Sequence, residues 1–364
     1  MSHQLSRNFS GDLYISITGR VVPRYAILAE GAFDYILSKT GNAIIRYRPE
    51  EVVCVVDSRT VAKTAADVLG IGEDIPVVAS LQDAFQHNPN AVLIGTAPPG
   101  GQLPQSGREM ILLAIENKLD VVAGLHSFLS DDTEFSDLAT KKGVNIWDLR
   151  KPPDPLPFSK GSWQTRKTPV LLTVGTDCDT GKMTAAWELK CELESQGVKT
   201  AFVGTGQTGI LLGGFGVPVD AVVSDFMAGA IEAEVDKAAK DSDIVIVEGQ
   251  GSVTHMVYSG VTVGLLHGCM PEMLLMCHEP GRELDTFGYP MAPFHLVLDI
   301  YMKLVEPFRP TELVGISLMT PLFDEKTAAE RVKEYGERFE VPVSDPVRYG
   351  MVKIAENIIK YLNC

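Results

Sequence analysis

The stretch PVLLTVGTDCDTGKMT, residues 169–184, combines three features that together indicate the fold. It opens with the apolar run PVLLTVG (169–175), which is typical of a buried β-strand. A loop that ends in Gly181-Lys182 follows, and the next segment, KMTAAWELKCELESQG (182–197), is typical of an amphipathic helix. A strand, a glycine-containing loop and a helix in this order predict a phosphate-binding loop.

The loop 175–184 can hold an anion through its backbone and Lys182. It departs from the usual motif in two ways: five residues rather than four separate Gly175 from Gly181, and Met183 stands where a Ser or Thr ligates Mg²⁺. A thioether is a poor ligand for a hard cation. We therefore expect the loop to hold the phosphates of a cofactor that is not hydrolysed there, such as coenzyme A. The predicted cofactor-binding residues are Gly175, Thr176, Asp179, Thr180, Gly181, Lys182, Met183 and Thr184.

Apolar runs alternate with helix-like segments on both sides of this motif. The later runs are KTAFVGTG (199–206), DIVIVEGQG (243–251), MLLMCHE (273–279) and ELVGISLMT (312–320). The earlier runs are AILAE (26–30), VVCVVD (52–57), AVLIG (91–95) and DVVAG (120–124). Apolar strands separated by helices predict parallel sheets with crossover helices.

A proline-rich segment divides the two alternating regions. In KPPDPLPFSKGSWQTRKTP (151–169), four of the first seven residues are proline, which neither continues a helix nor donates to a β-ladder. We therefore predict a two-domain α/β protein, and its 364 residues suit two domains of about 100–200 residues each. The predicted parts are an N-terminal extension (1–24), a first parallel-sheet domain (25–150), a linker (151–168) and a second parallel-sheet domain (169–364).

The composition excludes several classes of partner. With 32 Lys and Arg against 47 Asp and Glu, the net charge is −15, so nucleic acid and anionic membranes are poor partners. No apolar run reaches the roughly 18 residues of a membrane span, and the N-terminus lacks a signal-peptide core. The six cysteines have no CxxC spacing, which argues against a zinc site. We expect a cytoplasmic protein that binds small molecules, contains no metal and, on general frequency alone, is a homo-oligomer.

Other candidate residues follow the predicted strands, where parallel sheets bind ligands. Glu248, in the loop Glu248-Gly-Gln-Gly-Ser252, can serve as a general base, a metal ligand or an orienter of a substrate ammonium group. Gln250 and His255 belong to the same loop. Gln207 follows an earlier strand, and Arg282 suits bidentate binding of a carboxylate. The competing interpretations are a glycine-rich surface turn for the first loop and a solvated side chain for Arg282.

The first predicted domain contains weaker indications of a ligand-binding site. Asp57 ends a strand at the position of a ribose-binding acid, and GTAPPGG (95–101) is a crevice loop. However, AILAEGAFDYI contains a single glycine and therefore lacks the dinucleotide-binding fingerprint G-x-G-x-x-G.

At these residues the chain resembles known families. The opening Gly-Thr-Asp of the loop and the strand that ends in Glu-Gly resemble the dethiobiotin synthetase and MinD class of phosphate-loop proteins. More closely, nearly the whole chain from Tyr25 resembles a two-domain family long catalogued as a domain of unknown function. The matching segments are AEGAF (29–33), IRYRPEEVV (45–53), APPGG (97–101), GLHSFLSDD (124–132), GTDCDTGKMT (175–184), EGQGS (248–252), YSGVTVGLLHG (258–268) and CHEPGR (277–282). The resemblance implies an N-terminal Rossmann-like parallel sheet and a C-terminal P-loop NTPase-like parallel sheet.

The resemblance also implies a function. Members of the family are identified as D-glutamate N-acetyltransferases that use acetyl-CoA, so we expect acetyl transfer to the amine of an acidic amino acid, with D-glutamate as the first candidate. In this hypothesis Glu248, His255 or Asp177 is the catalytic base, with Asp179 as a further alternative. The substrate-binding residues would be Gln207, Gln250, Ser252 and Arg282.

Three alternatives stay open at this stage. A covalent route through Cys178 is one, because a thiol at a helix N-terminus can have a lowered pKa. An ATP- and Mg²⁺-dependent ligase of the dethiobiotin synthetase type is the second, although Met183 counts against it. A nucleotide-binding regulator without chemistry is the third.

Overall fold

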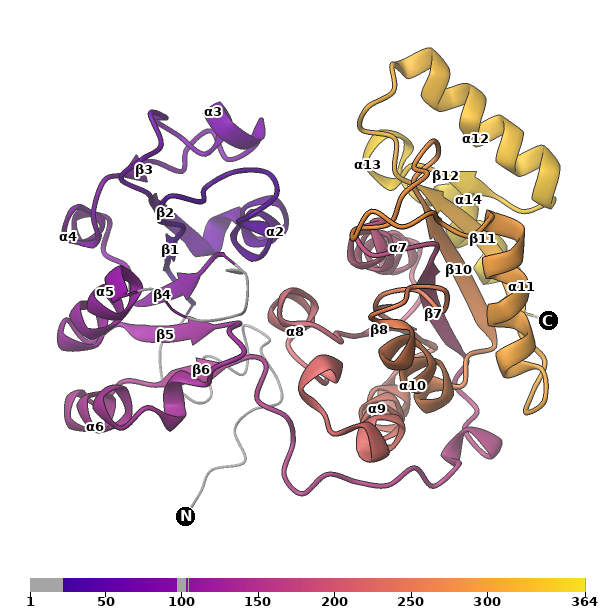
Figure 1. The fold of residues 1–364 in the computed structure, drawn as a ribbon, viewed down its shortest axis with the longest axis horizontal. Helices are drawn as coiled ribbons and strands as arrows, with labels where there is room; N and C mark the ends of the chain where they lie inside the picture. Colours follow the sequence, from indigo (N-terminus) through magenta and orange to yellow (C-terminus); the bar gives the residue numbers. More distant parts are fainter. Residues whose placement is uncertain (1–21, 97–102, 104, 364) are drawn as a thin grey trace. The chain divides into compact units, whose positions relative to one another are not determined.

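The computed structural model describes residues 22–96, 103 and 105–363, which form two compact units (Figure 1). The first unit comprises the described residues up to Pro152 together with Gln207–Ala221, and the second comprises Pro153–Gly206 and the described residues from Val222 onward. Each unit contains a six-stranded sheet in which all pairs of neighbouring strands are parallel. The predicted α/β class is therefore confirmed. Most of the expected N-terminal extension (1–24) and the segment APPGG (97–101) lie outside the described residues.

The first sheet has the strand order β3-β2-β1-β4-β5-β6. Its strands are β1 (Tyr25–Leu28), β2 (Val52–Val56), β3 (Val77–Val78), β4 (Ala91–Ile94), β5 (Asp120–Ala123) and β6 (Ile146–Asp148). Helices α4 (Leu81–Ala84), α5 (Gln105–Glu116) and α6 (Thr133–Lys142) cover one face, and α2 (Lys39–Tyr47) covers the other (Figure 1). Because both faces are covered, every residue of β1, β4 and β5 is buried, which explains why these strands are continuous apolar runs.

Helix α8 (Gln207–Gly213) belongs to the first unit, whereas the sequence predicts that residues 169–364 form the second domain. The hydroxyl oxygens of Thr208 and Thr40 are 3.0 Å apart, and the guanidinium of Arg48 donates to the carbonyl of Leu212. Ile210, Leu211 and Leu212 are buried. The sequence of such a short apolar helix does not predict which of the two units it packs against.

The second sheet has the order β12-β11-β10-β7-β9-β8. Its strands are β7 (Val170–Gly175), β8 (Thr200–Val203), β9 (Ile244–Val247), β10 (Met273–His278), β11 (Glu312–Leu318) and β12 (Val343–Ser344). Helices α7 (Lys182–Ser195) and α14 (Val352–Leu362) lie on one face, and α9 (Ser224–Ala238), α10 (Ser259–Cys269) and α11 (Phe294–Val305) lie on the other (Figure 1). Since β7 lies between β9 and β10, the loops after these three strands meet at one carboxyl edge, where open parallel sheets bind ligands.

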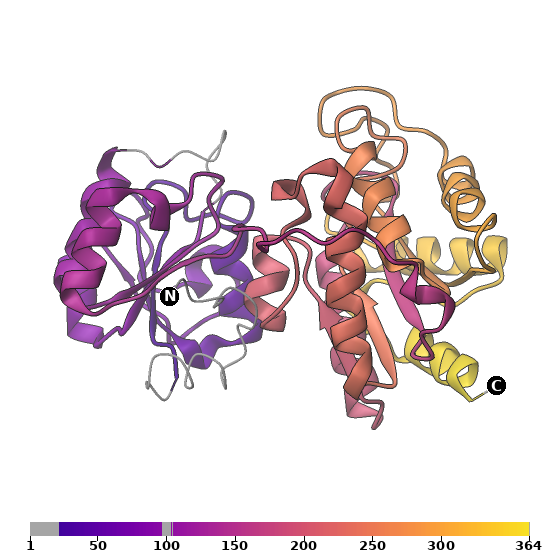
Figure 2. The same ribbon diagram turned by 90° about the horizontal axis from the view of Figure 1, so that it is seen from below.

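The proline-rich segment is packed against the second unit along part of its length, as Figure 2 shows. The carboxylate of Glu232 on α9 accepts the backbone N–H groups of Lys160 (2.8 Å) and Gly161 (3.0 Å). A Cβ atom added at Gly229 would lie 2.1 Å from the carbonyl oxygen of Pro157. This stretch of the expected linker is therefore fixed on α9 rather than a free spacer.

Two helical segments are shorter than the sequence pattern suggests. Within 60–70 only α3 (Ala66–Leu69) is helical, because the carboxylate of Asp67 accepts the N–H groups of Lys63 and Thr64 and forms a turn there. The C-terminal segment is interrupted at Gly350, which has a φ of 70° and separates α13 (Pro346–Tyr349) from α14. Among the described residues, no helix has both the length and the apolar character that crossing a bilayer requires.

Candidate functional site

The loop 175–184 connects β7 to α7, as the sequence motif predicts. Asp179 (φ 56°) and Gly181 (φ 83°) both have left-handed backbone conformations, and they curl the chain before the helix begins. Gly181 is the N-cap of α7, and Lys182 is its first residue. Such a curl followed by a helix N-terminus is a backbone geometry that binds anions.

The side chain of Lys182 lies inside this curl. It is buried, and its Nζ donates to the carbonyl of Asp177 (2.6 Å) and to Thr180 Oγ1 (3.3 Å). The hydroxyl of Thr180 donates to the same carbonyl (3.1 Å). Burial lowers the pKa of the Lys182 ammonium. Met183 and Thr184 follow in the first turn of α7 and are half-buried.

Glu248 follows β9, and backbone N–H groups bind only one of its two carboxylate oxygens. Its Oε2 accepts the backbone N–H groups of Thr205 (2.8 Å) and Gly206 (3.3 Å). The hydroxyl of Thr205 donates to the Glu248 carbonyl (2.8 Å) and accepts from Nε2 of Gln250 (3.0 Å). Burial raises the pKa of Glu248 from 4.5 to about 7, although these hydrogen bonds and the charge of Lys182 oppose the change. A carboxyl group that titrates near neutrality can both accept and release a proton at physiological pH.

Gly249 brings this loop into contact with the phosphate loop. A Cβ atom at this position would lie 1.7 Å from the carbonyl oxygen of Thr173 on β7 and 3.1 Å from Cδ of Lys182. The N–H of Gly249 donates to Thr173 Oγ1 (2.9 Å). Only glycine fits this close approach, so the Glu-Gly pair of the motif places Glu248 beside β7.

Asp177 connects the phosphate loop with the loop after β10. It is buried, and its Oδ2 accepts Nη2 of Arg282 (2.6 Å) and the N–H of Thr286 (3.0 Å). Arg282 also donates to the carbonyls of Cys178 (3.0 Å) and Leu284 (3.2 Å). The guanidinium predicted to bind a substrate carboxylate is thus engaged by groups of its own chain, because the loop after β10 folds back onto the phosphate loop.

His255 is buried beside Asp177. Its Nδ1 accepts the backbone N–H groups of Val257 (3.2 Å) and Tyr258 (3.3 Å), so the neutral ring carries its proton on Nε2. Nε2 lies 3.2 Å from Thr286 Oγ1 and 3.6 Å from Asp177 Oδ1. In this arrangement Nε2 of His255 can donate a hydrogen bond, but it has no lone pair with which to accept a proton.

Asp177, Cys178 and His255 have donor atoms within 4.8 Å of one another, a spacing that suits a metal ion. A metal-bound imidazole usually donates its second ring nitrogen to an acceptor, whereas Nδ1 of His255 faces two donors. Burial also raises the pKa of the Cys178 thiol, which disfavours the thiolate that binds metal. The chemistry of these donors therefore does not fit a metal ion.

Two residues outside the predicted set support the site. Tyr301 on α11 donates its hydroxyl to the Gly175 carbonyl (3.1 Å) and accepts the N–H of Val253 (3.2 Å). His278, the last residue of β10, has Nδ1 at 2.9 Å from Thr176 Oγ1, and burial, with a contribution from Arg282, lowers its pKa to about 4. His278 lay within the predicted apolar run 273–279, but nothing in the sequence distinguished Tyr301 from its apolar helix.

The predicted substrate residues are divided between the units. Gln250, Ser252 and Arg282 belong to the second unit, and Ser252 is fully buried with Oγ at 3.2 Å from Thr254 Oγ1. Gln207 belongs to the first unit, where a Cβ atom added at Gly124 would lie 2.6 Å from its Cγ.

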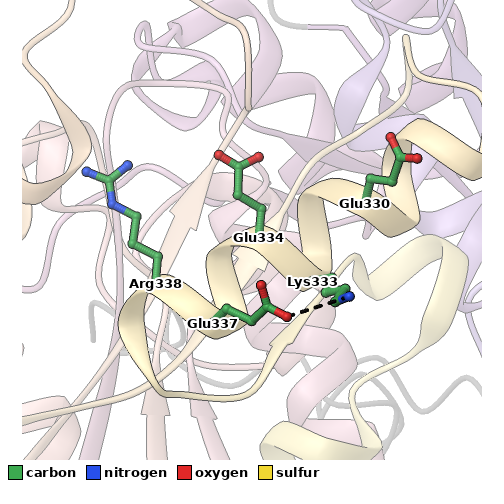
Figure 3. Close-up of a pocket in the computed structure, with 5 residues that line it drawn as sticks. All are labelled: Glu330, Lys333, Glu334, Glu337 and Arg338. Carbon is green, nitrogen blue, oxygen red and sulfur yellow. Dashed lines mark ion pairs between the residues drawn. The ribbon is translucent and has the colours of Figure 1, made fainter.

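A depression on α12 (Glu325–Phe339) is a poor candidate for a site (Figure 3). Its lining consists of five exposed charged residues: Glu330, Lys333, Glu334, Glu337 and Arg338. Lys333 and Glu337 form an i,i+4 ion pair of 3.6 Å, which is typical of a solvated helix face.

Family models match both units. The model described as "Domain of unknown function (DUF1611_C) P-loop domain" matches residues 157–355, and the DUF1611_N model, a Rossmann-like domain, matches residues 58–152. The crystal structure of a DUF1611 family protein from Anabaena variabilis superposes with a TM-score of 0.88 at 33% identity, and the match covers 93% of this chain and 99% of that one.

Two curated relatives match along almost their whole length. A protein of Tritonibacter scottomollicae named D-glutamate N-acetyltransferase is 32% identical over 336 residues, which cover 91% of this chain and 97% of the relative. A Pseudoalteromonas protein of the same name is 32% identical over 344 residues, which cover 93% and 99%. The predicted Rossmann-like and P-loop domains are confirmed, and the chain belongs to the DUF1611 family.

Proposed function

We propose that this protein is an N-acetyltransferase that moves the acetyl group of acetyl-CoA to the amine of D-glutamate. The observation that carries the proposal is the similarity, over more than nine-tenths of the chain, to two proteins named D-glutamate N-acetyltransferase. The reaction needs an anion-binding site for the acyl carrier and a base for the substrate ammonium group. The second unit offers a candidate for each.

The loop 175–184 is the candidate site for the phosphates of coenzyme A. Its curled backbone, the N-terminus of α7 and the buried Lys182 supply N–H groups and positive charge in a chain of net charge −15. Met183 leaves the position after the lysine without the hydroxyl that holds Mg²⁺ in nucleotide hydrolysis. These features suit a carrier that is bound without being cleaved at its phosphates.

Glu248 is the best-supported base among the three catalytic candidates. Nε2 of His255 carries a proton, and Asp177 already accepts from Arg282 and Thr286. Glu248 has a pKa of about 7, so ionised and protonated forms coexist at neutral pH.

The surroundings of Cys178 favour direct transfer over a covalent acetyl-cysteine. Burial raises the pKa of its thiol, and Nε2 of His255 has no lone pair to take the thiol proton. We therefore expect Cys178→Ala to keep activity within about threefold of the wild type. Initial rates at varied concentrations of both substrates should give intersecting double-reciprocal lines. Parallel lines together with an inactive Cys178→Ala variant would establish the covalent route instead.

The test is an assay of coenzyme A release from acetyl-CoA in the presence of D-glutamate, with L-glutamate and D-aspartate as alternative acceptors. We expect release that depends on D-glutamate and an N-acetylated product detected by mass spectrometry. Lys182→Ala should weaken acetyl-CoA binding by about tenfold or more, because a charge-assisted contact is lost. Phosphate release from ATP that depends on Mg²⁺ and an acidic substrate, without acetyl transfer, would replace this function with that of a ligase.

A further inference from the structure

Three rings next to the phosphate loop form one cluster, which we call the aromatic shelf: His255, Tyr258 and Phe287. The ring of His255 stacks on Tyr258, with centroids 4.9 Å apart and planes at 25°. Phe287 meets His255 edge-on at 5.5 Å and lies 6.1 Å from Tyr258. The rings come from the loops after β9 and β10, at the edge of the sheet that also carries the loop 175–184.

The shelf is fixed to the phosphate loop through Asp177. Its Oδ2 accepts the N–H of Thr286, the residue before Phe287, and its Oδ1 lies 3.6 Å from Nε2 of His255. Asp285 accepts the N–H groups of Phe287 (2.8 Å) and Tyr289 (2.9 Å) and thereby forms the turn that presents Phe287. One carboxylate of the anion-binding loop therefore binds the Phe287 side of the shelf through Thr286 and lies beside its His255 side.

Two of the three rings of the shelf, those of Tyr258 and Phe287, are exposed to solvent. The exposed fractions of Tyr258 and Phe287 are 40% and 54%, and the neighbouring Met256 and Val257 are 66% and 51% exposed. The ring of His255 is covered by the other two and buried. A contiguous exposed apolar patch usually marks a place where a ligand or a partner binds.

The neighbouring loop indicates which ligand fits. A ligand that lies on both features must carry phosphate and, close to it, a flat ring that stacks on Tyr or Phe. D-glutamate has neither group, whereas the nucleotide end of coenzyme A has both. We propose that the aromatic shelf binds the adenine ring of the acyl-CoA whose diphosphate lies in the loop 175–184, an inference that rests on the proposed function.

The test compares three ligands on the full-length protein: acetyl-CoA, ADP and inorganic pyrophosphate. Phe287→Leu and Tyr258→Leu keep apolar bulk but remove the ring faces. Tyr289→Leu is the matched control, because Tyr289 lies on the same turn, is 51% exposed and is not part of the shelf. Thermal melts first establish that each variant is folded, and titration calorimetry then gives each dissociation constant.

We expect the Tyr258→Leu/Phe287→Leu double variant to bind acetyl-CoA and ADP about tenfold more weakly, the effect of losing one stacked base. Its affinity for pyrophosphate should not change, and Tyr289→Leu should bind all three ligands as the wild type does. Unchanged affinity for ADP in the double variant would overturn the proposal. A loss for acetyl-CoA alone would also overturn it and assign the shelf to the pantetheine arm. Failure of the proposed function is distinct, since wild-type protein would then bind ADP but not acetyl-CoA.

Discussion

Asp57 and Glu248 each follow a buried parallel strand and accept backbone N–H groups, yet their pKa values shift in opposite directions. Burial acts to raise the pKa of Asp57, but donors from Thr60, Arg59, Gly31 and Phe33 together lower it. Glu248 is also buried but accepts only two backbone N–H groups, both on one oxygen, so burial dominates and its pKa rises to about 7. Two sheets of the same class therefore use the same chemical group differently.

The number of hydrogen-bond donors around each carboxyl group accounts for the opposite pKa shifts. In the first unit both oxygens of Asp57 are engaged, Oδ1 by Gly31 and Arg59 and Oδ2 by Phe33 and Thr60, and the carboxylate organises the loops around it. The carboxylate that the sequence suggested as a ribose-binding acid is thus engaged by groups of its own chain. In the second unit the less-saturated Glu248 remains able to exchange a proton near pH 7.

The largest expected effect is the loss of activity in Glu248→Gln. The amide oxygen can still accept from Thr205 and Gly206, so the fold should persist, but the side chain cannot take a proton. Loss of a general base typically lowers kcat by about 10²–10⁴-fold. The matched amide substitution Asp57→Asn in the other sheet should leave kcat within about twofold. Equal kcat in Glu248→Gln and the wild type would assign the base to another group. Glu248 and Asp57 would then no longer differ in role.

The pH dependence of stability is the next expected effect. Because the folded-state pKa of Glu248 is raised, its contribution to stability is fully present below pH 4.5 and is lost as the pH rises to about 7. The free energy of unfolding should fall by about 3 kcal/mol from this group across that range. Urea denaturation at several pH values measures the decrease, and Glu248→Gln should flatten it. The lowered pKa of Asp57 acts oppositely, with stability lost as the pH falls through its pKa.

The smallest expected effect is on the first unit, through Asp57→Ala. This change leaves the N–H groups of Gly31, Phe33 and Arg59 without their acceptor, which should cost about 2 kcal/mol of unfolding free energy. Hydrogen exchange measured by mass spectrometry should localise the loss of protection to β1 and β2, with β7 and β9 unchanged. Equal loss in both sheets would mean that the two units do not unfold separately.

The periodicity of apolar residues predicted most of both sheets, because strands covered on both faces are continuous apolar runs. β3, with only Val77–Val78, is too short to give such a signal. The phosphate loop was equally clear, since glycine, lysine and a flanking strand and helix are all local in the sequence. The three-residue β6 likewise lay at the limit of detection.

The class of both domains and the loop that can hold an anion could be predicted from the amino-acid sequence, because each depends on spacing within one strand, loop and helix. The family followed from the resemblance of several segments along the chain. Three features came from the folded chain alone: Arg282 is engaged by Asp177, His255 carries its proton on Nε2, and α8 packs in the first unit. Arg282 and Asp177 are 105 residues apart, and no local pattern encodes a partner at that distance. Burial and hydrogen bonding together set what each polar group can do, and both are properties of the folded chain.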